Sequence, residues 1–227
     1  YFTTEYMRDA GTPERFREVG LEQAEGLWSQ KNLEKKQKCI FLDRDGTLNV
    51  YRGLLSDIRK FELEKDAAEA VRMINRSGYL AIVVTNQPVV ARGMCSMADV
   101  ERIHRKMQTL LGEKGAYLDD IVFCPHHPDK GFAEENPAYK IPCDCRKPHI
   151  GMIRQMAEKY NIDLHESYMI GDSTTDIQTG IRAGTKTVLV RTGEAVLDGK
   201  YAVKADYNAD NVLDAIKYIL FHRSKEG

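Results

Sequence analysis

Short apolar segments alternate with segments of helical spacing along most of this chain. The strand-length apolar runs cover residues 38–42, 79–84, 121–123, 168–170 and 186–190. Helical spacing is found over residues 66–77, 97–112, 150–160, 174–183 and 211–221. The alternation predicts an α/β fold, a Rossmann-like parallel sheet with helices on both faces. Ligands of such sheets bind beyond the carboxyl ends of the strands.

Residues 1–36 differ from the rest of the chain, because they are rich in Glu and Lys and lack strand-like runs. Thr12-Pro13 is typical of a helix start, with Thr as the N-cap and Pro at the first helical position. We expect a helix over residues 13–36 with a sparse apolar face made of Phe16, Val19, Ala24, Leu27 and Trp28. The expected organisation is a helical appendage over 1–36 and a larger domain over 37–227.

Composition limits the classes of partner. The net charge of −1 over 227 residues gives no electrostatic reason to expect nucleic acid. No apolar run reaches the roughly 18 residues that cross a bilayer, and the polar first residues do not resemble a signal peptide. An odd number of cysteines, five, argues against a secreted disulfide framework. We therefore expect a cytoplasmic protein with no membrane partner.

Carboxylates follow two of the expected strands. Asp43-Arg44-Asp45-Gly46-Thr47 follows the first strand, and Asp172 follows the fourth, with Asp176 one helical turn further on. Thr85 ends the second strand, and Arg146-Lys147 precedes a helix. Taken alone, the first loop is as well explained by solvated turn residues. Together these groups offer what phosphoryl transfer needs, namely carboxylates for a divalent cation and a fixed cation for developing charge.

Cys124-Pro125-His126 and Cys143-Asp144-Cys145 flank an irregular segment, residues 127–142. Three thiolates and one imidazole form a tetrahedral Zn²⁺ set of the Cys₃His type. Cys124, His126, Cys143 and Cys145 are the expected ligands, with His127 as the competing histidine. A closed set of four protein ligands predicts a structural zinc that tethers the long loop. The alternative is four unrelated residues, since free Cys is often a small core residue.

The carboxylate motifs resemble the haloacid dehalogenase superfamily. The resemblance is carried by Asp43-x-Asp45-Gly46-Thr47, then Thr85, Lys147 and Gly171-Asp172-x-x-x-Asp176, in this order from about Lys38 to the C-terminus. It implies that Asp43 attacks phosphorus and that Asp45 acts as general acid and then general base. It also implies Mg²⁺ bound by the Asp43 carboxylate, the Asp45 backbone carbonyl and Asp172. Thr85 and Lys147 would hold the phosphoryl oxygens, and Asp176 would support the fourth motif.

Within this superfamily the chain resembles the D-glycero-D-manno-heptose 1,7-bisphosphate 7-phosphatases, which act in the synthesis of nucleotide-activated heptose for surface polysaccharide such as lipopolysaccharide. Asn49, Ala91-Arg92-Gly93 and His127 separate it from the related histidinol-phosphate phosphatases. The resemblance implies a small sugar phosphate as substrate and a monomeric phosphatase domain. The implied substrate contacts are Arg52, Gly53, Thr85, Asn86, Gln87, Arg92, Arg146 and Lys147. Arg92 is a candidate for the distal phosphate.

Residues 9–15 resemble the end of a sugar-phosphate nucleotidyltransferase domain. This implies a possible fusion, although a capped helix start explains the same residues equally well. No nucleotidyltransferase activity is expected of so short a remnant. The anomer stays open, with a lean to alpha if a fused partner makes a GDP-sugar. The alternatives to the heptose substrate are a histidinol-phosphate or broad sugar-phosphate phosphatase and a non-enzymatic module that binds a protein through the zinc loop.

Overall fold

Six parallel strands form one sheet in the order β3-β2-β1-β4-β5-β6 in the computed structural model, which describes residues 7, 9–129, 131, 134–194 and 197–221. The strands are β1 (Lys38–Leu42), β2 (Tyr79–Asn86), β3 (Asp120–Cys124), β4 (Tyr168–Gly171), β5 (Lys186–Val190) and β6 (Tyr207–Ala209). Ile40 of β1 pairs with Ala81 of β2 on one side and Tyr168 of β4 on the other. β1 is therefore a central strand, and the chain order reverses beside it.

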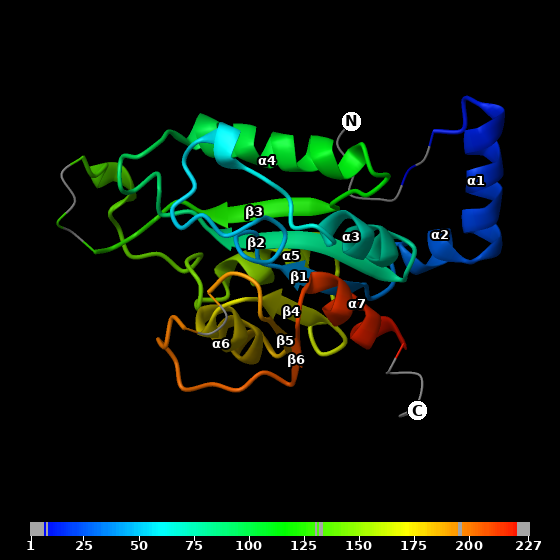
Figure 1. Ribbon diagram of the computed structural model, residues 1–227. Helices are drawn as coiled ribbons and strands as arrows, with labels where there is room; N and C mark the ends of the chain where they lie inside the picture. Colours follow the sequence, from blue (N-terminus) through cyan, green and yellow to red (C-terminus); the bar gives the residue numbers. More distant parts are fainter. Residues whose placement is uncertain (1–6, 8, 130, 132–133, 195–196, 222–227) are drawn as a thin grey trace.

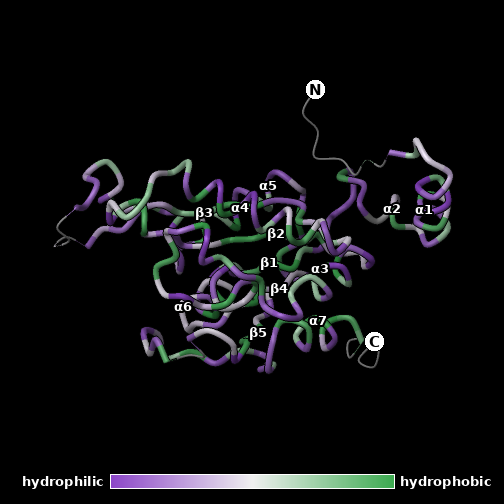
Figure 2. Tube along the Cα trace, turned by 45° about the horizontal axis from the view of Figure 1, so that its top comes forward, coloured by the Kyte–Doolittle hydropathy of each residue, from purple (hydrophilic) through white to green (hydrophobic). Residues whose placement is uncertain are grey.

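Two layers of helices cover the sheet (Figure 1). One layer contains α3 (Ala67–Asn75), α4 (Met97–Gly112) and α7 (Val212–Phe221), and the other contains α5 (Gly151–Lys159) and α6 (Thr174–Ala183). Side chains of β1 alternate between these layers, with Ile40 and Leu42 packed in the first and Cys39 and Phe41 in the second. All four are fully buried, which contributes about 1.5–3 kcal/mol for each large one. The apolar run is thus the signature of a strand buried on both faces, and Figure 2 shows the hydrophobic residues gathered along the central strands.

The prediction of an α/β parallel sheet with helices on both faces is confirmed. The predicted helices over 97–112 and 174–183 have the same bounds in the structure, and Ser96 and Ser173 cap them through reciprocal hydrogen bonds with Asp99 and Asp176. The short strand β6 was not predicted, because three residues carry too little pattern to distinguish a strand from a loop.

The single helix predicted over residues 13–36 is wrong. Thr12 caps α1 (Pro13–Ala24) as expected, but Gly26 adopts φ 76° and ends it, and only the short α2 (Leu27–Gln30) follows. A left-handed glycine is a common helix terminator, since it lacks the Cβ that penalises this conformation. The expected apolar face also fails to pack: Phe16 is 68% exposed, and Leu27 is the member that is buried.

The segment after α1 is attached to the sheet by a buried ion pair. Lys31 Nζ lies 3.0 Å from the Tyr117 hydroxyl and 3.7 Å from Asp119 Oδ1, just before β3. Burial lowers the pKa of Lys31, and the Asp119 charge opposes this effect. In Figure 1, α1 and α2 lie at the opposite end of the molecule from the long loop that carries η2 (Pro137–Tyr139).

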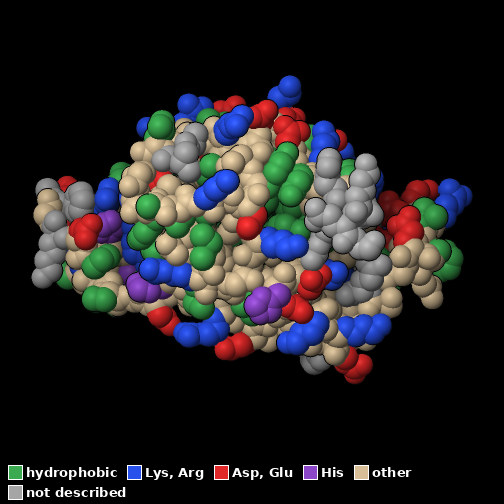
Figure 3. Space-filling view, turned by 90° about the horizontal axis from the view of Figure 1, so that it is seen from below, with side chains coloured by type: hydrophobic (Ala, Val, Ile, Leu, Met, Phe, Trp, Pro, Cys, Tyr) green, Lys and Arg blue, Asp and Glu red, His purple; other side chains and the backbone are tan. Residues whose placement is uncertain are grey.

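The surface is mixed in charge. Figure 3 shows Lys and Arg side chains interspersed with Asp and Glu side chains on one face, in keeping with the net charge of −1. No helix in the described part of the chain is long and apolar enough to cross a membrane.

Candidate active site

The carboxyl edge of the sheet brings together side chains that are far apart in the sequence. Asp43 follows β1, Thr85 lies near the end of β2, and Asp172 follows β4. Lys147 reaches this edge from the loop before α5, with its Nζ 2.7 Å from Asp43 Oδ1 and 2.5 Å from Asp176 Oδ1. Carboxylate oxygens of Asp43, Asp172 and Asp176 lie within 4.8 Å of one another. Asp43, Lys147 and Asp172 therefore form one cluster with Asp176.

The cluster holds more negative charge than Lys147 alone balances. Burial, with the charges of Asp176 and Asp45, raises the pKa of Asp43 to about 6, although Lys147 opposes the rise. Burial and the charges of Asp176 and Asp43 raise the pKa of Asp172 to about 8. Hard oxygen donors with unbalanced negative charge are the ligands that Mg²⁺ prefers. The residues present thus fit a divalent cation between Asp43 and Asp172.

Asp176 is held by its own helix and is the least available of the three for a metal. Ser173 donates to Asp176 Oδ2 through its hydroxyl at 2.6 Å and its backbone N–H at 3.2 Å, while Lys147 occupies Oδ1. A Cβ on Gly171 would lie 2.4 Å from the Asp176 carboxyl carbon, so glycine is required there. This agrees with the expected supporting role of Asp176.

Two glycines enclose the Asp172 carboxylate. A Cβ on Gly46 or Gly193 would lie 2.3 Å or 2.0 Å from Asp172 Oδ2, and both glycines have positive φ. The Glu194 backbone N–H donates to the same oxygen at 2.6 Å. Sequence reasoning missed residues 192–194. The available signal was the Thr192-Gly193 step, which lies just after the end of β5.

Asp45 faces a different set of partners. Its Oδ1 accepts from Asn49 Nδ2 at 3.0 Å and its Oδ2 accepts from Gln87 Nε2 at 2.8 Å. The Arg44 guanidinium donates to both oxygens, at 2.9 and 2.7 Å. Burial raises the pKa of Asp45, but the Arg44 charge and these hydrogen bonds outweigh it and lower the pKa overall. Both carboxylate oxygens of Asp45 are thus engaged by these side chains, which leaves the Asp45 backbone carbonyl as its expected metal ligand.

The other predicted substrate contacts are distributed around this edge. Gln87 also donates to Thr85 Oγ1 at 2.9 Å, and Asn86 exchanges two hydrogen bonds with the Lys147 backbone. Gln87 therefore supports the Thr85 side chain, and Asn86 holds the backbone of Lys147. The structure does not bring Arg52 to the cluster: it pairs with Glu62 at 3.0 Å on the exposed loop that contains Gly53.

Arg92 and Arg146 lie near each other beside the long loop. Arg146 Nη1 donates to the His126 carbonyl at 3.1 Å, and a Cβ on Gly93 would overlap the Glu134 backbone carbonyl. The turn that carries Arg92 is thus packed directly on the loop. Burial lowers the pKa of Arg146, and the nearby Arg92 charge adds to this effect. A cationic pair of this kind favours an anion beside it.

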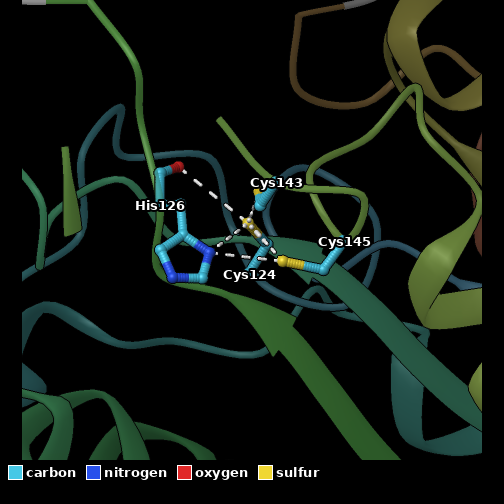
Figure 4. Close-up of side chains that lie close together, drawn as sticks. All are labelled: Cys124, His126, Cys143 and Cys145. Atoms are coloured by element: carbon cyan, nitrogen blue, oxygen red, sulfur yellow. Dashed lines mark hydrogen bonds between the residues drawn. The ribbon is translucent and has the colours of Figure 1, made fainter. Parts of the chain in front are cut away.

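The four predicted zinc ligands converge at the end of β3 (Figure 4). Cys124 Sγ lies 3.5 Å from Cys143 Sγ and 3.1 Å from Cys145 Sγ, and His126 Nδ1 lies 3.3 Å from Cys145 Sγ. Disulfide bonds are about 2.05 Å long, whereas a tetrahedron with zinc–sulfur bonds of about 2.3 Å separates its sulfurs by about 3.8 Å. The spacing therefore fits a shared metal. His127 is directed elsewhere, since its Nδ1 accepts from the Asp129 backbone N–H at 3.2 Å.

The strand order, with carboxylates and a buried lysine at the carboxyl edge beside the central strand, is that of the haloacid dehalogenase-like hydrolases, a class of phosphatases. A family model described as HAD-hydrolase-like matches residues 144–215. The D-glycero-beta-D-manno-heptose-1,7-bisphosphate 7-phosphatase of Haemophilus ducreyi is 39% identical over 185 residues, which cover 81% of this chain and 98% of the relative. The enzyme of the same name from Escherichia coli K12 is 40% identical over 186 residues, covering 81% and 92%.

A solved structure agrees with the sequence relatives. The D,D-heptose 1,7-bisphosphate phosphatase from B. bronchiseptica, complexed with magnesium and phosphate, superposes with a TM-score of 0.71 at 28% identity and covers 84% of this chain and 100% of that chain. The chain belongs to the family of D-glycero-D-manno-heptose 1,7-bisphosphate 7-phosphatases. The relatives are matched over nearly their whole length by the phosphatase part, so they give no support to a fused nucleotidyltransferase domain.

Proposed function

We propose that this protein removes the 7-phosphate of D-glycero-D-manno-heptose 1,7-bisphosphate. The observation that carries the proposal is 39–40% identity over nearly the full length of relatives with that name, in a chain whose Asp43–Lys147 cluster is intact. Both relatives are named for the beta anomer, which makes the beta anomer the first substrate to test and argues against the lean to alpha.

Asp43 is the nucleophile in this proposal. A carboxylate oxygen of Asp43 attacks phosphorus, the bond from phosphorus to the C7 oxygen breaks, and an aspartyl phosphate forms. The leaving oxygen takes a proton from the Asp45 carboxyl group. Asp45 then takes a proton from water, which attacks the aspartyl phosphate and releases inorganic phosphate. Asp45 thus gives up one proton in the first step and regains one in the second.

Lys147 and Thr85 keep the transferred phosphoryl group in place. The Lys147 ammonium is already fixed by two carboxylates, so it needs no reorganisation as negative charge develops on the phosphoryl oxygens. Asp43, the Asp45 backbone carbonyl and Asp172 would hold Mg²⁺, which supplies further screening of that charge when it is bound.

Arg92 and Arg146 are the proposed contacts for the 1-phosphate, which stays on the product. A bisphosphate carries a second dianion. This dianion would reduce the repulsion between the two nearby guanidinium groups. Arg146 adjoins Lys147 in the sequence, so one loop would contact both phosphates.

The Cys124, His126, Cys143 and Cys145 cluster is proposed as a structural Zn²⁺ site. All four positions of a tetrahedron are filled by protein atoms, which leaves none for a substrate. Hydrogen bonding from the Cys124 thiol lowers the pKa of Cys145 although burial opposes it, and this favours a thiolate there. The metal would fix the loop that carries Arg146 and Lys147.

The substrate proposal is tested by measuring kcat/KM for both anomers of the heptose bisphosphate, histidinol phosphate and hexose phosphates. We expect the beta-heptose bisphosphate to give the highest value, and a higher value for histidinol phosphate would overturn the substrate while leaving the mechanism intact. Asp43→Asn should lower kcat by several orders of magnitude. Asp210→Asn, in a surface ion pair with Arg191, is the matched control and should change little.

The zinc proposal is tested by elemental analysis of the purified protein. We expect one zinc per chain in the wild type and none in the double variant Cys143→Ser/Cys145→Ser. The variant should also lose stability, because metal binding contributes to folding free energy. Zinc retained at full stoichiometry in the double variant would refute the assignment.

A further inference from the structure

Arg44 is the largest fully buried side chain among the described residues, at 0% exposure. Its Nη2 donates to both Asp45 oxygens and to Gln87 Oε1 at 2.9 Å, and its Nη1 lies 3.2 Å from His104 Nε2 on α4. Its Nε has no hydrogen-bond partner among those residues. Burying a charge with an unsatisfied donor costs stability, so a function other than packing is indicated.

His104 is at one end of a series of contacts that runs through Arg44 to Asp45. Arginine has donors only, so His104 Nε2 must accept the hydrogen bond and the ring proton must be on Nδ1. Burial and the Arg44 charge lower the pKa of His104 to about 3, which agrees with a neutral ring. Phe123 of β3 packs edge-on against the ring with centroids 5.1 Å apart. His104 therefore joins a packed helix to the guanidinium.

Asp45 is at the other end of these contacts, and its neighbours restrict its side chain. Arg44, Gln87 and Asn49 bind its carboxylate from the protein side, while the side chain stays 17% exposed. The carboxylate is thus held by three side chains and still reaches solvent. A group that first gives a proton to the leaving oxygen and then takes one from water must stay in one place through both steps.

We propose that His104 and Arg44 are positioning residues that hold the Asp45 carboxylate in its acid–base orientation, with His104 acting through Arg44. The inference rests on the proposed function of Asp45. It predicts that loss of His104 harms the proton transfer and leaves substrate binding nearly intact. A merely structural role would lower activity on all substrates in proportion to folded protein.

The experiment compares two leaving groups. Breaking the bond to an alkyl oxygen needs a proton from Asp45, whereas 4-nitrophenolate leaves without one. The quantity compared is the rate of the first step, measured in a single turnover as release of the sugar alcohol or of 4-nitrophenol, because the second step is the same for both substrates. His104→Leu, which keeps the side-chain volume, should lower this rate for the heptose bisphosphate about ten-fold or more. The substrate concentration for half-maximal single-turnover rate should change less than about two-fold, and the first-step rate for 4-nitrophenyl phosphate less than about three-fold. His104→Gln offers Arg44 an acceptor again and should recover most of the loss.

Three further variants separate positioning from packing. Asp45→Asn should show the same leaving-group dependence more strongly, and adding His104→Leu to it should cause little further loss, since His104 acts through Asp45. Ile103→Ala on the same helix is the packing control and should leave the ratio of the two first-step rates unchanged. Equal loss of the first-step rate on both substrates, or no rescue by His104→Gln, would overturn the inference.

The outcome is distinguishable from a failure of the substrate proposal. If the wild type prefers another sugar phosphate, that alkyl phosphate replaces the heptose bisphosphate and the comparison is unchanged. A wild-type protein that releases phosphate from neither class would overturn both proposals.

Discussion

Replacing Lys147 with methionine should destabilise the metal-free protein by about 3–5 kcal/mol at pH 7.5, because the change leaves two buried carboxylates without their common cation. The three side chains are 3%, 12% and 1% exposed, and Lys147 Nζ lies 2.7 and 2.5 Å from the two carboxylate oxygens. For a chain of this length, 1 kcal/mol corresponds to roughly 2–4 °C in Tm. A decrease of roughly 6–20 °C is therefore expected.

The assay is urea and thermal unfolding in EDTA at pH 7.5 and 5.5. Without Lys147, the folded-state pKa of Asp43 lies further above its unfolded value, so the folded variant binds an extra proton as the pH falls. The stability difference between variant and wild type should shrink at pH 5.5. Lys159→Met is the matched control, since Lys159 pairs with Asp120 at the same 2.7 Å but is 44% exposed. A surface pair contributes about 0–1 kcal/mol. A loss below about 1 kcal/mol in Lys147→Met would refute the reasoning.

Three other predictions follow from the geometry. Gly193→Ala places a Cβ 2.0 Å from Asp172 Oδ2 and should raise the Mg²⁺ concentration for half-maximal activity about ten-fold or more; an unchanged titration would contradict it. Lys31→Met should lower the free energy of unfolding by about 3 kcal/mol and leave kcat unchanged. If the residues around Lys31 were not packed on the sheet, the substitution would leave the free energy of unfolding almost unchanged. Burial raises the folded-state pKa of Asp172 to about 8, so its stabilising contribution in the metal-free protein should be complete below about pH 4 and lost as the pH rises through 8. Saturating Mg²⁺ should flatten that dependence, and a metal-free protein with equal stability at pH 6 and 9 would count against it.

The division into an appendage over 1–36 and a domain over 37–227 stays a proposal. The structure shows that the two parts are not fully separate. Leu27 and Lys31 are buried, whereas α1 buries none of its side chains. The first part of the predicted appendage thus protrudes, while its last part belongs to the packing of the sheet. The Lys31 variant measures how much of the stability depends on that contact.

The sequence by itself determined the layered fold and most of the site. The apolar runs of β1, β2, β4 and β5 are buried on both faces of the sheet, so the position of each run in the chain fixes where its polar end lies. That is why Asp43, Thr85 and Asp172 could be placed at one edge without coordinates. Ser96 and Ser173 cap their helices through contacts with residues three positions further on. Such contacts can be predicted from the local sequence.

Only the tertiary structure decided the contacts that cross between segments. Arg44 meets Gln87 and His104 from positions 43 and 60 residues away, and no local pattern distinguishes this arginine from a solvated one. The approach of Gly193 to Asp172 depends on the packing of two loops, and the end of α1 depends on the backbone conformation of Gly26. Burial and long-range pairing depend on how separate segments pack, and that information is absent from the periodicity of any one segment.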